Sequence, residues 1–188
     1  MKGRSLFRII KPFTYLFKII FQITPMFLTM FIWRLSDLLG GYLGNFLKFS
    51  ILFAKAKKCG SNIYIGKHVE IKKINQLEIG SNVSIHEFCY IDCTGGLSIS
   101  NNVSIAHNCS IMTENHSWSD NSIPIKYNPM LTKPVEISED CWIGCGVRVL
   151  AGSKLNKRTI VAAGSVVNKI YEGNVIIGGI PGKIIKTL

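Results

Sequence analysis

Histidine is the side chain best suited to proton transfer near neutral pH, and this chain of 188 residues has four. A neutral imidazole can remove the proton of a hydroxyl group while that hydroxyl attacks an electrophile. His116 lies in the stretch Thr-Glu-Asn-His-Ser-Trp (113–118), within the one long interruption of a regular repeat. Because loops on rigid scaffolds commonly carry function, His116 is the candidate general base. The alternative is an ordinary exposed loop histidine.

The other three histidines could form a metal site only if their side chains converged. His68, His86 and His107 occupy outward positions of regular six-residue repeats. In the phase of that repeat, His86 stacks beside Ala106. His107 stacks beside Glu87, so the histidines form no column. We therefore expect no metal ion.

Six cysteines could indicate disulfides or a metal site. Two pairs, Cys89/Cys93 and Cys141/Cys145, have a CxxxC spacing rather than the CxxC spacing of zinc sites. The repeat places Cys89, Cys109 and Cys141 at the same buried position of their hexads, where a free cysteine acts as a small apolar side chain. We expect reduced thiols and hence a cytosolic protein.

The elements that must position these side chains follow from a period of six residues. An Ile, Val, Leu or Cys leads each hexad, and the hexads come in groups of three. The step is six within a group, and eight, eight, 26 and six between groups. The leading residues are Cys59, Ile65, Ile71, Ile79, Ile85, Ile91, Ile99, Ile105, Ile111, Ile137, Ile143, Val149, Leu155, Val161 and Val167.

The grouping by three predicts a triangular coil, because every third strand then ends at the same edge. We expect a parallel β-helix of about five coils, each with three short strands, stacked by backbone hydrogen bonds around a narrow apolar core. All insertions should leave at one corner, near residues 73–78 and 93–98 and as a long loop at 112–136. A β-sandwich is the rival fold, but it would not keep a six-residue phase over fifteen segments.

Residues 1–58 differ from the repeats in charge and in pattern. The chain has a formal net charge of +11, and this segment holds ten Lys or Arg and one acid, Asp37. Pro12, Pro25 and the Gly40-Gly41 pair divide it into short apolar helices. The repeat domain, residues 59–188, is nearly neutral, and we expect no nucleic acid as a partner.

The longest uncharged run in residues 1–58, from Ile19 to Trp33, has 15 residues, whereas a membrane span needs about 20. The sequence after this run is not the small-residue site at which signal peptides are cleaved. Apolar helices flanked by Lys and Arg suit the surface of an anionic membrane, and we expect the segment to bind one. Packing on the β-helix or on a neighbouring subunit is one alternative, and a true membrane span is another.

With the phase fixed, residues 60–186 resemble the hexapeptide-repeat acyltransferases, a family of left-handed parallel β-helices. The branch that is most similar contains galactoside and maltose O-acetyltransferases and the O-acetyltransferases of bacterial surface polysaccharides. The N-terminal segment lies outside the pattern of the sugar enzymes and is similar to apolar leaders of some polysaccharide-modifying relatives. Four motifs carry the resemblance: Thr-Glu-Asn-His-Ser-Trp (113–118), Cys-Trp-Ile-Gly-Cys-Gly (141–146), Ala-Ala-Gly-Ser-Val-Val-Asn-Lys (162–169) and Gly-Gly-Ile-Pro-Gly-Lys-Ile-Ile-Lys (178–186).

The resemblance implies a homotrimer that binds acetyl-CoA in the groove between neighbouring β-helices. His116 of one subunit would act together with residues of the next subunit. The acetyl group would pass directly from the thioester to a hydroxyl, without an acyl-enzyme. A backbone N–H would stabilise the oxyanion.

The resemblance also assigns roles around the reacting groups. Trp142 would form a wall of the acetyl or acceptor pocket, unless it is only a packing aromatic. His86 lies thirty residues before His116, where sugar-modifying relatives carry an asparagine, so His86 is a candidate acceptor contact. Cys145 matches a small residue near the thioester and is a candidate contact rather than a nucleophile, because no neighbour in sequence would lower its pKa.

Five further positions match contacts to the rest of coenzyme A. Ala163 and Asn168 match contacts to the pantetheine arm. Lys169, Lys183 and Lys186 match basic positions that hold the phosphates, and their alternative is ordinary surface lysine. Relatives often have Arg at the last two positions, and Lys keeps the charge without the bidentate geometry.

Together these patterns predict an acetyl-CoA-dependent O-acetyltransferase that acts on a saccharide, either a surface polysaccharide or its lipid-linked precursor. The basic apolar leader motivates a membrane-linked acceptor and a place in the cytoplasm, at the inner face of the cytoplasmic membrane. Two alternatives stay open. The same fold could acetylate a small acceptor such as a xenobiotic, an amino sugar or serine, or the β-helix could be a non-catalytic scaffold.

Overall fold

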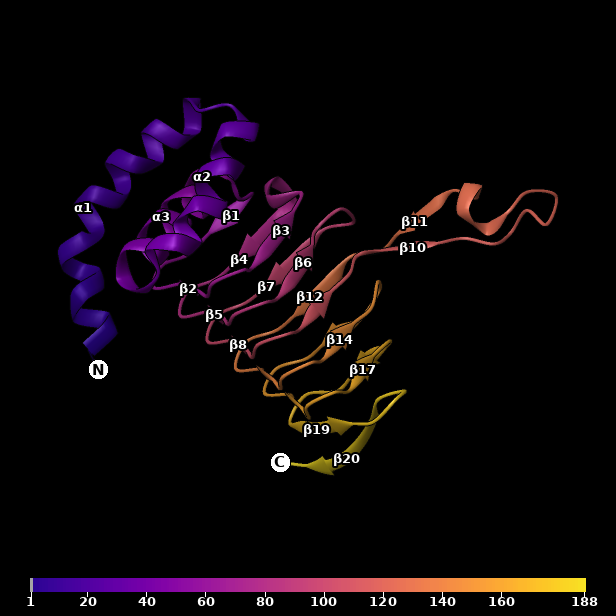
Figure 1. The fold of residues 1–188 in the computed structure, drawn as a ribbon. Coiled ribbons are helices and arrows are strands. Elements are labelled where there is room, and N and C mark those ends of the chain that lie inside the picture. Colours follow the sequence, from indigo (N-terminus) through magenta and orange to yellow (C-terminus); the bar gives the residue numbers. More distant parts are fainter. Residues whose placement is uncertain (1) are drawn as a thin grey trace.

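A helical segment followed by a stack of short strands makes up the chain (Figure 1). The computed structural model describes the backbone of residues 2–188 and the side chains of residues 13–188. Pro25 precedes the second helix, and Gly40, with a φ of 56°, turns the chain from the second helix into the third. The helices are α1 (Lys2–Ile23), α2 (Met26–Leu39) and α3 (Gly41–Lys55).

Three parallel sheets form the sides of the stack, and each coil contributes one strand to each sheet in turn. The first sheet contains β1 (Lys58–Cys59), β4 (Leu77–Ile79), β7 (Leu97–Ile99), β12 (Val135–Ile137), β15 (Lys154–Leu155) and β18 (Ile170–Tyr171). The second contains β2 (Tyr64–Ile65), β5 (Ser84–Ile85), β8 (Ser104–Ile105), β13 (Trp142–Ile143), β16 (Ile160–Val161) and β19 (Val175–Gly178), with β20 (Lys183–Thr187) added antiparallel. The third contains β3 (Glu70–Lys72), β6 (Tyr90–Asp92), β9 (Ser110–Ile111), β14 (Arg148–Val149) and β17 (Val166–Val167).

The residues that lead the hexads pair with one another from coil to coil. In the second sheet, for example, Ile105 pairs with Ile143 in the next coil. The predicted parallel β-helix, with three strands per coil and the predicted phase, is confirmed. The structure adds a sixth, partial coil led by Tyr171 and Ile177. The step from Val167 to Tyr171 is only four residues, which is why a six-residue count ends one coil early.

Asparagine makes the tight corner between the first and second sheets. Asn62, Asn82 and Asn102 occupy this corner in successive coils, with φ values of 56°, 58° and 59°. This left-handed conformation strains most L residues, but Asn tolerates it. Their side chains also form a ladder, because Asn62 Nδ2 donates to Asn82 Oδ1 at 2.8 Å and Asn82 Nδ2 donates to Asn102 Oδ1 at 3.0 Å. The corner thus repeats with one geometry and keeps the strands in register.

The core of the β-helix is a narrow column of aliphatic side chains. Ile85 and Ile143 have no exposed surface, as expected for hexad leaders. The predicted burial of Cys89, Cys109 and Cys141 is confirmed, and all three are free thiols. Burial raises the pKa of Cys141 above its ordinary value, so this side chain stays protonated and packs as a small apolar group.

Helices α2 and α3 cover the open end of the first coil. The end of a solenoid exposes unpaired backbone groups, which must be covered or paired. Trp33 Nε1 donates to the Val69 carbonyl at 2.8 Å. Lys48, with only 2% of its side chain exposed, donates from Nζ to the Gly66 carbonyl at 2.5 Å and also pairs with Asp37. Helices α2 and α3 therefore pack on the β-helix, which was one of the two alternatives to membrane binding for residues 1–58.

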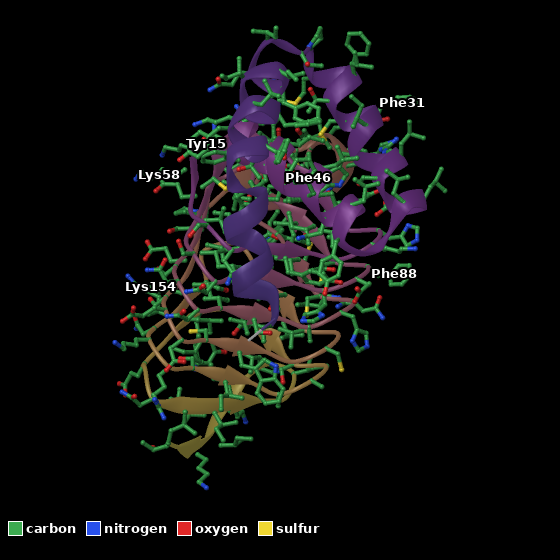
Figure 2. The ribbon with its side chains drawn as sticks, turned by 90° about the vertical axis from the view of Figure 1, so that its left-hand side faces the viewer. Tyr15, Phe31, Phe46, Lys58, Phe88 and Lys154 are labelled. Carbon is green, nitrogen blue, oxygen red and sulfur yellow. The ribbon has the colours of Figure 1, made fainter. Side chains whose placement is uncertain are left out.

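The outer side of these helices is apolar and exposed. Figure 2 shows Phe31 projecting from the helical segment, away from the strands. Among the described residues, no helix combines the length and the apolarity needed to cross a bilayer. The large apolar side chains exposed on α1 and α2 include Phe13, Leu16, Ile19, Ile23, Phe27, Phe31, Leu35 and Leu38.

Candidate active site

A β-hairpin carries His116 away from the body of the β-helix (Figure 1). The hairpin consists of β10 (Glu114–His116) and β11 (Met130–Thr132), and it leaves at the corner where the third sheet ends and the first begins. The short helix η1 (Ile74–Gln76) lies at the same corner two coils earlier in the repeat pattern, between β3 and β4. The predicted single corner for insertions is therefore confirmed. His116 pairs with Met130, and its side chain is exposed.

Polar contacts fix the base of the hairpin. Thr113 is fully buried, and its Oγ1 donates to the Asp92 carbonyl at 3.0 Å. Lys72 Nζ donates to the carboxylate of Glu114, and this hydrogen bond raises the pKa of Lys72. Glu114 and His116 are two residues apart in β10, so they share one face of the strand. The β-helix thus determines where the strand that carries His116 begins.

The far end of the hairpin has no apolar core of its own. Its loop, with the short helix η2 (Ile125–Tyr127), closes on Asn128, whose Oδ1 accepts from the Asp120 N–H at 2.9 Å and whose Nδ2 donates to the Asp120 carbonyl at 3.1 Å. A two-stranded hairpin is only marginally stable alone in water, and this one presents an apolar surface suited to contact with another molecule. Its exposed apolar side chains include Trp118, Ile125, Tyr127, Met130 and Leu131.

A second group of predicted residues lies at the corner between the second and third sheets. His86, Cys145 and Ala163 each follow a leading residue of the second sheet by one or two positions. The carbonyl of Cys145 accepts from the N–H of residue 164 at 2.8 Å, which places Cys145 and Ala163 in adjacent coils. Gly144 is required here, because a Cβ at this position would lie 2.7 Å from the Ala163 nitrogen. His86 lies at the same corner two coils before Cys145, or about 10 Å from it along the axis of the β-helix.

Trp142 lies on the outer face of the second sheet, in one row with residues of the C-terminal strands. It pairs with Ile160, which pairs with Ile176, and Ile176 pairs with Lys186 of β20. Three strand spacings separate Trp142 from Lys186, or about 14 Å. Trp142 is 54% exposed, so it is not a buried packing residue within this chain. A shallow depression of about 370 Å³ adjoins it, lined by Asn102, Ser104, Asp140, Trp142, Arg158, Ile160 and Leu188.

The remaining predicted contacts to coenzyme A lie in two places. Lys183 is in β20 and pairs with Gly178 at the C-terminal end of the second sheet. Asn168 and Lys169 lie at the corner between the third and first sheets, the corner from which the hairpin leaves two coils earlier. Lys169 is exposed, and its Nζ lies 5.4 Å from the centre of the buried Tyr171 ring.

The structure does not bring these residues together within one chain. His116 leaves at one corner, whereas His86, Cys145 and Ala163 lie at the corner one hexad away. Six residues of strand span at most about 20 Å, and the hairpin points outward from the β-helix rather than across the third sheet. Within one chain, the corner that carries His116 and the corner that carries Cys145 and Ala163 are therefore separate places.

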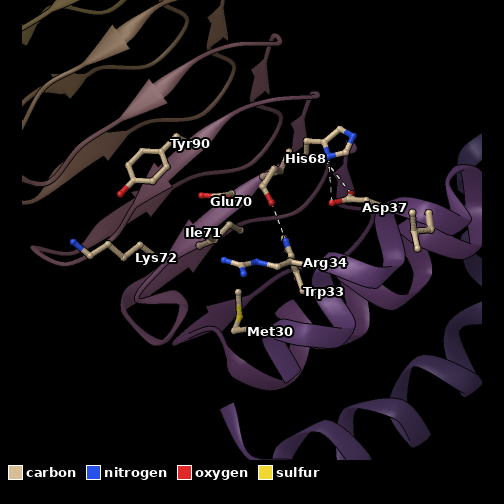
Figure 3. A pocket seen from close by; sticks show the side chains of 11 residues that line it. Met30, Trp33, Arg34, Asp37, His68, Glu70, Ile71, Lys72 and Tyr90 are labelled. Carbon is tan, nitrogen blue, oxygen red and sulfur yellow. Dashed lines mark hydrogen bonds and ion pairs between the residues drawn. The ribbon is translucent and has the colours of Figure 1, made fainter. Parts of the chain in front are cut away.

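One pocket includes residues that the repeat and the motifs did not single out. It has a volume of about 600 Å³ and lies between α2 and the third sheet (Figure 3). Asp37 Oδ1 accepts from the His68 N–H at 3.0 Å and so joins the two walls. Asp37 is the only acid in residues 1–58, the one signal in the sequence that could have marked this place. The lining residues that can hydrogen-bond a ligand through their side chains are Arg34, Asp37, His68, Glu70, Lys72 and Tyr90.

Comparison with known proteins supports the resemblance. Residues 134–169 match the family model of the bacterial transferase hexapeptide (six repeats). A galactoside O-acetyltransferase of Lactococcus lactis is 39% identical over 56 residues, which are 30% of this chain and 27% of that protein. The chain therefore spans about a quarter of the length of this curated relative.

Solved structures extend the similarity to the whole fold. A maltose O-acetyltransferase from Clostridium difficile superposes with a TM-score of 0.70 at 22% identity, over 97% of this chain and 88% of that one. A galactoside acetyltransferase in complex with coenzyme A superposes with a TM-score of 0.74 at 22% identity, over 82% of this chain and 76% of that one. At this identity the superpositions show the fold, and with the repeat match they confirm the predicted resemblance to the hexapeptide-repeat acetyltransferases.

Proposed function

We propose that this protein is an acetyl-CoA-dependent O-acetyltransferase that modifies a hydroxyl of a saccharide, in the form of a surface polysaccharide or its lipid-linked precursor. The observation that carries the proposal is the place of His116. It is exposed on a hairpin that a buried threonine and an ion pair attach to a hexapeptide β-helix. Similar structures include a galactoside acetyltransferase in complex with coenzyme A, which supports the class of donor.

In the proposed reaction, His116 removes the proton of the acceptor hydroxyl while its oxygen attacks the thioester carbon. A backbone N–H stabilises the oxyanion that forms. The tetrahedral intermediate then collapses, the carbon–sulfur bond breaks, and the imidazolium returns its proton to the leaving thiolate. The products are the acetyl ester and free coenzyme A, and the imidazole is neutral again.

We propose that the protein acts as a homotrimer, with each site between two subunits. The separation of His116 from His86, Cys145 and Ala163 within one chain supports this arrangement. The hairpin's exposed apolar side chains, Trp118 and Tyr127 among them, support it as well. Coenzyme A would lie along the groove, beside Cys145, Ala163 and Asn168, with its phosphates near Lys169, Lys183 and Lys186.

The acceptor would bind close to the base of the hairpin. The pocket between α2 and the third sheet ends at Lys72, whose ammonium group pairs with Glu114 two residues before His116. Its carboxylates and the Tyr90 ring are groups that can hydrogen-bond and stack against a sugar. His86 and Trp142 remain candidate acceptor contacts from the neighbouring subunit, Trp142 as a wall of the acetyl pocket.

We also propose that residues 1–58 hold the enzyme at an anionic membrane, at the inner face of the cytoplasmic membrane. The exposed apolar side chains of α1 and α2 support this, as does the excess of Lys and Arg in the segment. Sedimentation with phosphatidylglycerol vesicles tests the proposal. Binding that falls as salt is added is expected, and a chain that stays in the supernatant at low salt would contradict it.

The test of the main proposal measures release of free thiol from acetyl-CoA in the presence of a panel of saccharides. We expect turnover with at least one saccharide and a loss of about 100- to 10,000-fold in His116→Ala, the range of general base catalysis. Asn115→Ala is the matched control, because Asn115 neighbours His116 on the opposite face of β10. Near-normal turnover in His116→Ala would refute His116 as the base.

The thiol-release assay and a coenzyme A binding measurement separate the two alternatives. Thiol release with an amine, a xenobiotic or serine but with no saccharide would assign the fold to a small acceptor. Failure to bind coenzyme A at millimolar concentration would favour a non-catalytic scaffold.

A further inference from the structure

We infer that the acceptor saccharide is carried on a long-chain lipid through a phosphoryl group, and that α2 leads this molecule from the membrane to the pocket. The inference rests on the proposed acetyltransferase function and names the class of its substrate. It follows from a groove, an unpaired arginine and a polar pocket that lie in this order along one side of α2.

The side chains of α2 change from apolar to charged along one face. Phe27, Phe31 and Arg34 are four and three residues apart, so they lie on one side of the helix. A groove of about 490 Å³ runs over the first part of this face. Its walls are Phe27, Leu28, Met30, Phe31 and Arg34. Four of these five side chains are apolar, which suits a hydrocarbon chain.

Arg34 is shared by the groove and by the pocket between α2 and the third sheet. In Figure 3 its guanidinium extends from α2 into that pocket. The Arg34 side chain makes no hydrogen bond or ion pair with any residue that the structure describes. A guanidinium has five donors in a planar fork that matches a phosphoryl group. Arg34 is therefore placed to bind a phosphoryl group that joins an apolar chain to a polar one.

Beyond Arg34 the pocket is lined by hydrogen-bonding groups. Asp37, Glu70 and Tyr90 face the space between α2 and the third sheet (Figure 3). Carboxylates accept hydrogen bonds from sugar hydroxyls, and the exposed face of a tyrosine ring can pack on a sugar ring. The pocket continues to Lys72, which contacts the strand that carries His116. A sugar in this pocket would have its hydroxyls near the catalytic hairpin.

The outer surface of the helices fits a membrane at the matching depth. Ile19, Ile23 and Phe27 are exposed where α1 ends and α2 begins, and Ile23 and Phe27 are 83% and 78% exposed. Seven residues of helix separate Phe27 from Arg34, or about 10 Å. If α2 enters the membrane with its N-terminal end first, Phe27 reaches the acyl layer while Arg34, about 10 Å behind it along the helix axis, stays near the phosphates.

Vesicle flotation of the full chain tests this inference. The probes are phosphatidylcholine vesicles that contain a polyprenyl phosphate, vesicles that contain the corresponding polyprenol, and vesicles with phosphatidylglycerol at a matched surface charge. We expect the wild-type chain to bind the polyprenyl phosphate vesicles about tenfold more tightly than either of the others, the size of one charge-assisted hydrogen-bond pair.

Paired variants locate the effect. Arg34→Gln should remove the preference, whereas Lys18→Gln, which removes a charge from α1 outside the groove, should weaken binding to all anionic vesicles and keep the preference. Phe31→Gln should reduce the preference and Phe13→Gln should not, although the two residues are 57% and 59% exposed. Equal binding of the wild type to charge-matched vesicles, or a preference that survives in Arg34→Gln, would overturn the inference.

The outcome is independent of catalysis. His116→Ala should float with the same preference as the wild type, because His116 lies outside the groove. A chain that prefers polyprenyl phosphate but transfers no acetyl group would contradict the proposed function and leave the lipid preference standing. A chain that acetylates soluble saccharides without preferring polyprenyl phosphate would support the proposed function and contradict the lipid inference.

Discussion

The β-helix and the hairpin β10–β11 are built on opposite principles, although one is an insertion in the other. In the β-helix each inner coil hydrogen-bonds to the coil on either side, and leaders such as Ile85 and Ile143 are completely buried. In the hairpin the two strands pair only with each other. Five of their six residues are exposed, His116 and Met130 among them.

This difference separates stability from chemistry. The stacked coils supply a rigid frame whose corners repeat at a fixed spacing, so that a residue placed at a corner has a defined position. The hairpin breaks the repeat and places an imidazole where the frame cannot reach. Its base is fixed by Thr113 and Glu114, and its apolar tip is free to contact a second chain. If this account is right, changes in the two regions should affect different properties.

Removal of the hairpin should have the largest effect on activity and little effect on stability. Glu114 and Thr132 are paired, so an Asn-Gly turn can replace residues 115–131 and close the two ends. Transfer should fall by a factor of at least about 100, because the general base is lost. The β-helix of the single chain should still unfold near the wild-type denaturant midpoint, because the hairpin strands pair only with each other, and any lost subunit contact should appear separately as a change in oligomeric state. Activity within a few-fold of the wild type would contradict a catalytic hairpin.

A cavity in the β-helix should do the reverse. Ile143→Ala removes a fully buried leader from the middle of the stack and should lower the free energy of unfolding by about 2–5 kcal/mol. Ile170→Ala is the control, because Ile170 is 66% exposed and its loss should cost less than about 0.5 kcal/mol. Denaturant titration followed by circular dichroism measures both. Equal stability of the two variants would show that the leaders do not form the core.

The ion pair at the base of the hairpin should have a smaller effect, confined to activity. Glu114→Gln weakens the contact to Lys72 and lets β10 move, so kcat/KM should fall by about two- to fivefold, the size of one partly exposed ion pair. Glu78→Gln is the matched control, because Glu78 pairs with Lys57 and Lys58 on the first sheet, away from the hairpin. If both variants lost activity equally, the effect would not be specific to the hairpin.

The smallest expected effect is a pH dependence of stability on the first sheet. Hydrogen bonds from Lys57 and Lys58 hold the pKa of Glu78 at about 2, below its ordinary value of 4.5. A carboxyl with a depressed folded pKa stabilises the fold above its ordinary pKa, and this contribution is lost as the pH falls from about 4.5 toward 2. Glu78→Gln should therefore unfold with a slightly shallower dependence on pH in that window. An unchanged profile would show that these surface pairs contribute nothing.

The sequence predicted the β-helix well because each hexad repeats the same demand for one buried aliphatic residue. Fifteen leaders from Cys59 to Val167 carried that signal, and no single one was decisive. The sixth coil was missed because its leader, Tyr171, comes four residues after Val167 and is aromatic. The six-residue period therefore identified only the coils in which that spacing is kept.

The packing of the helical segment was harder to predict, because it depends on a charged side chain that is buried, whereas side chains of this type are usually exposed. Lys48 looks like a surface charge in sequence, but it is buried against Asp37 and the Gly66 carbonyl. The pocket beside α2 was missed for a related reason, since Arg34 and Lys72 lie far apart in sequence and share no motif. His116 was found because it lies in the one long insertion, but only the fold shows how far it lies from Cys145 and Ala163.

The most direct test of the account is complementation between two inactive variants. His116→Ala removes the base from the hairpin, and Ala163→Trp blocks the corner between the second and third sheets; each alone should be nearly inactive. If every site combines the hairpin of one subunit with the corner of the next, mixed trimers should regain activity, at about a quarter of the wild-type level for random mixing around a threefold axis. A mixture no more active than the separate variants would contradict the shared site.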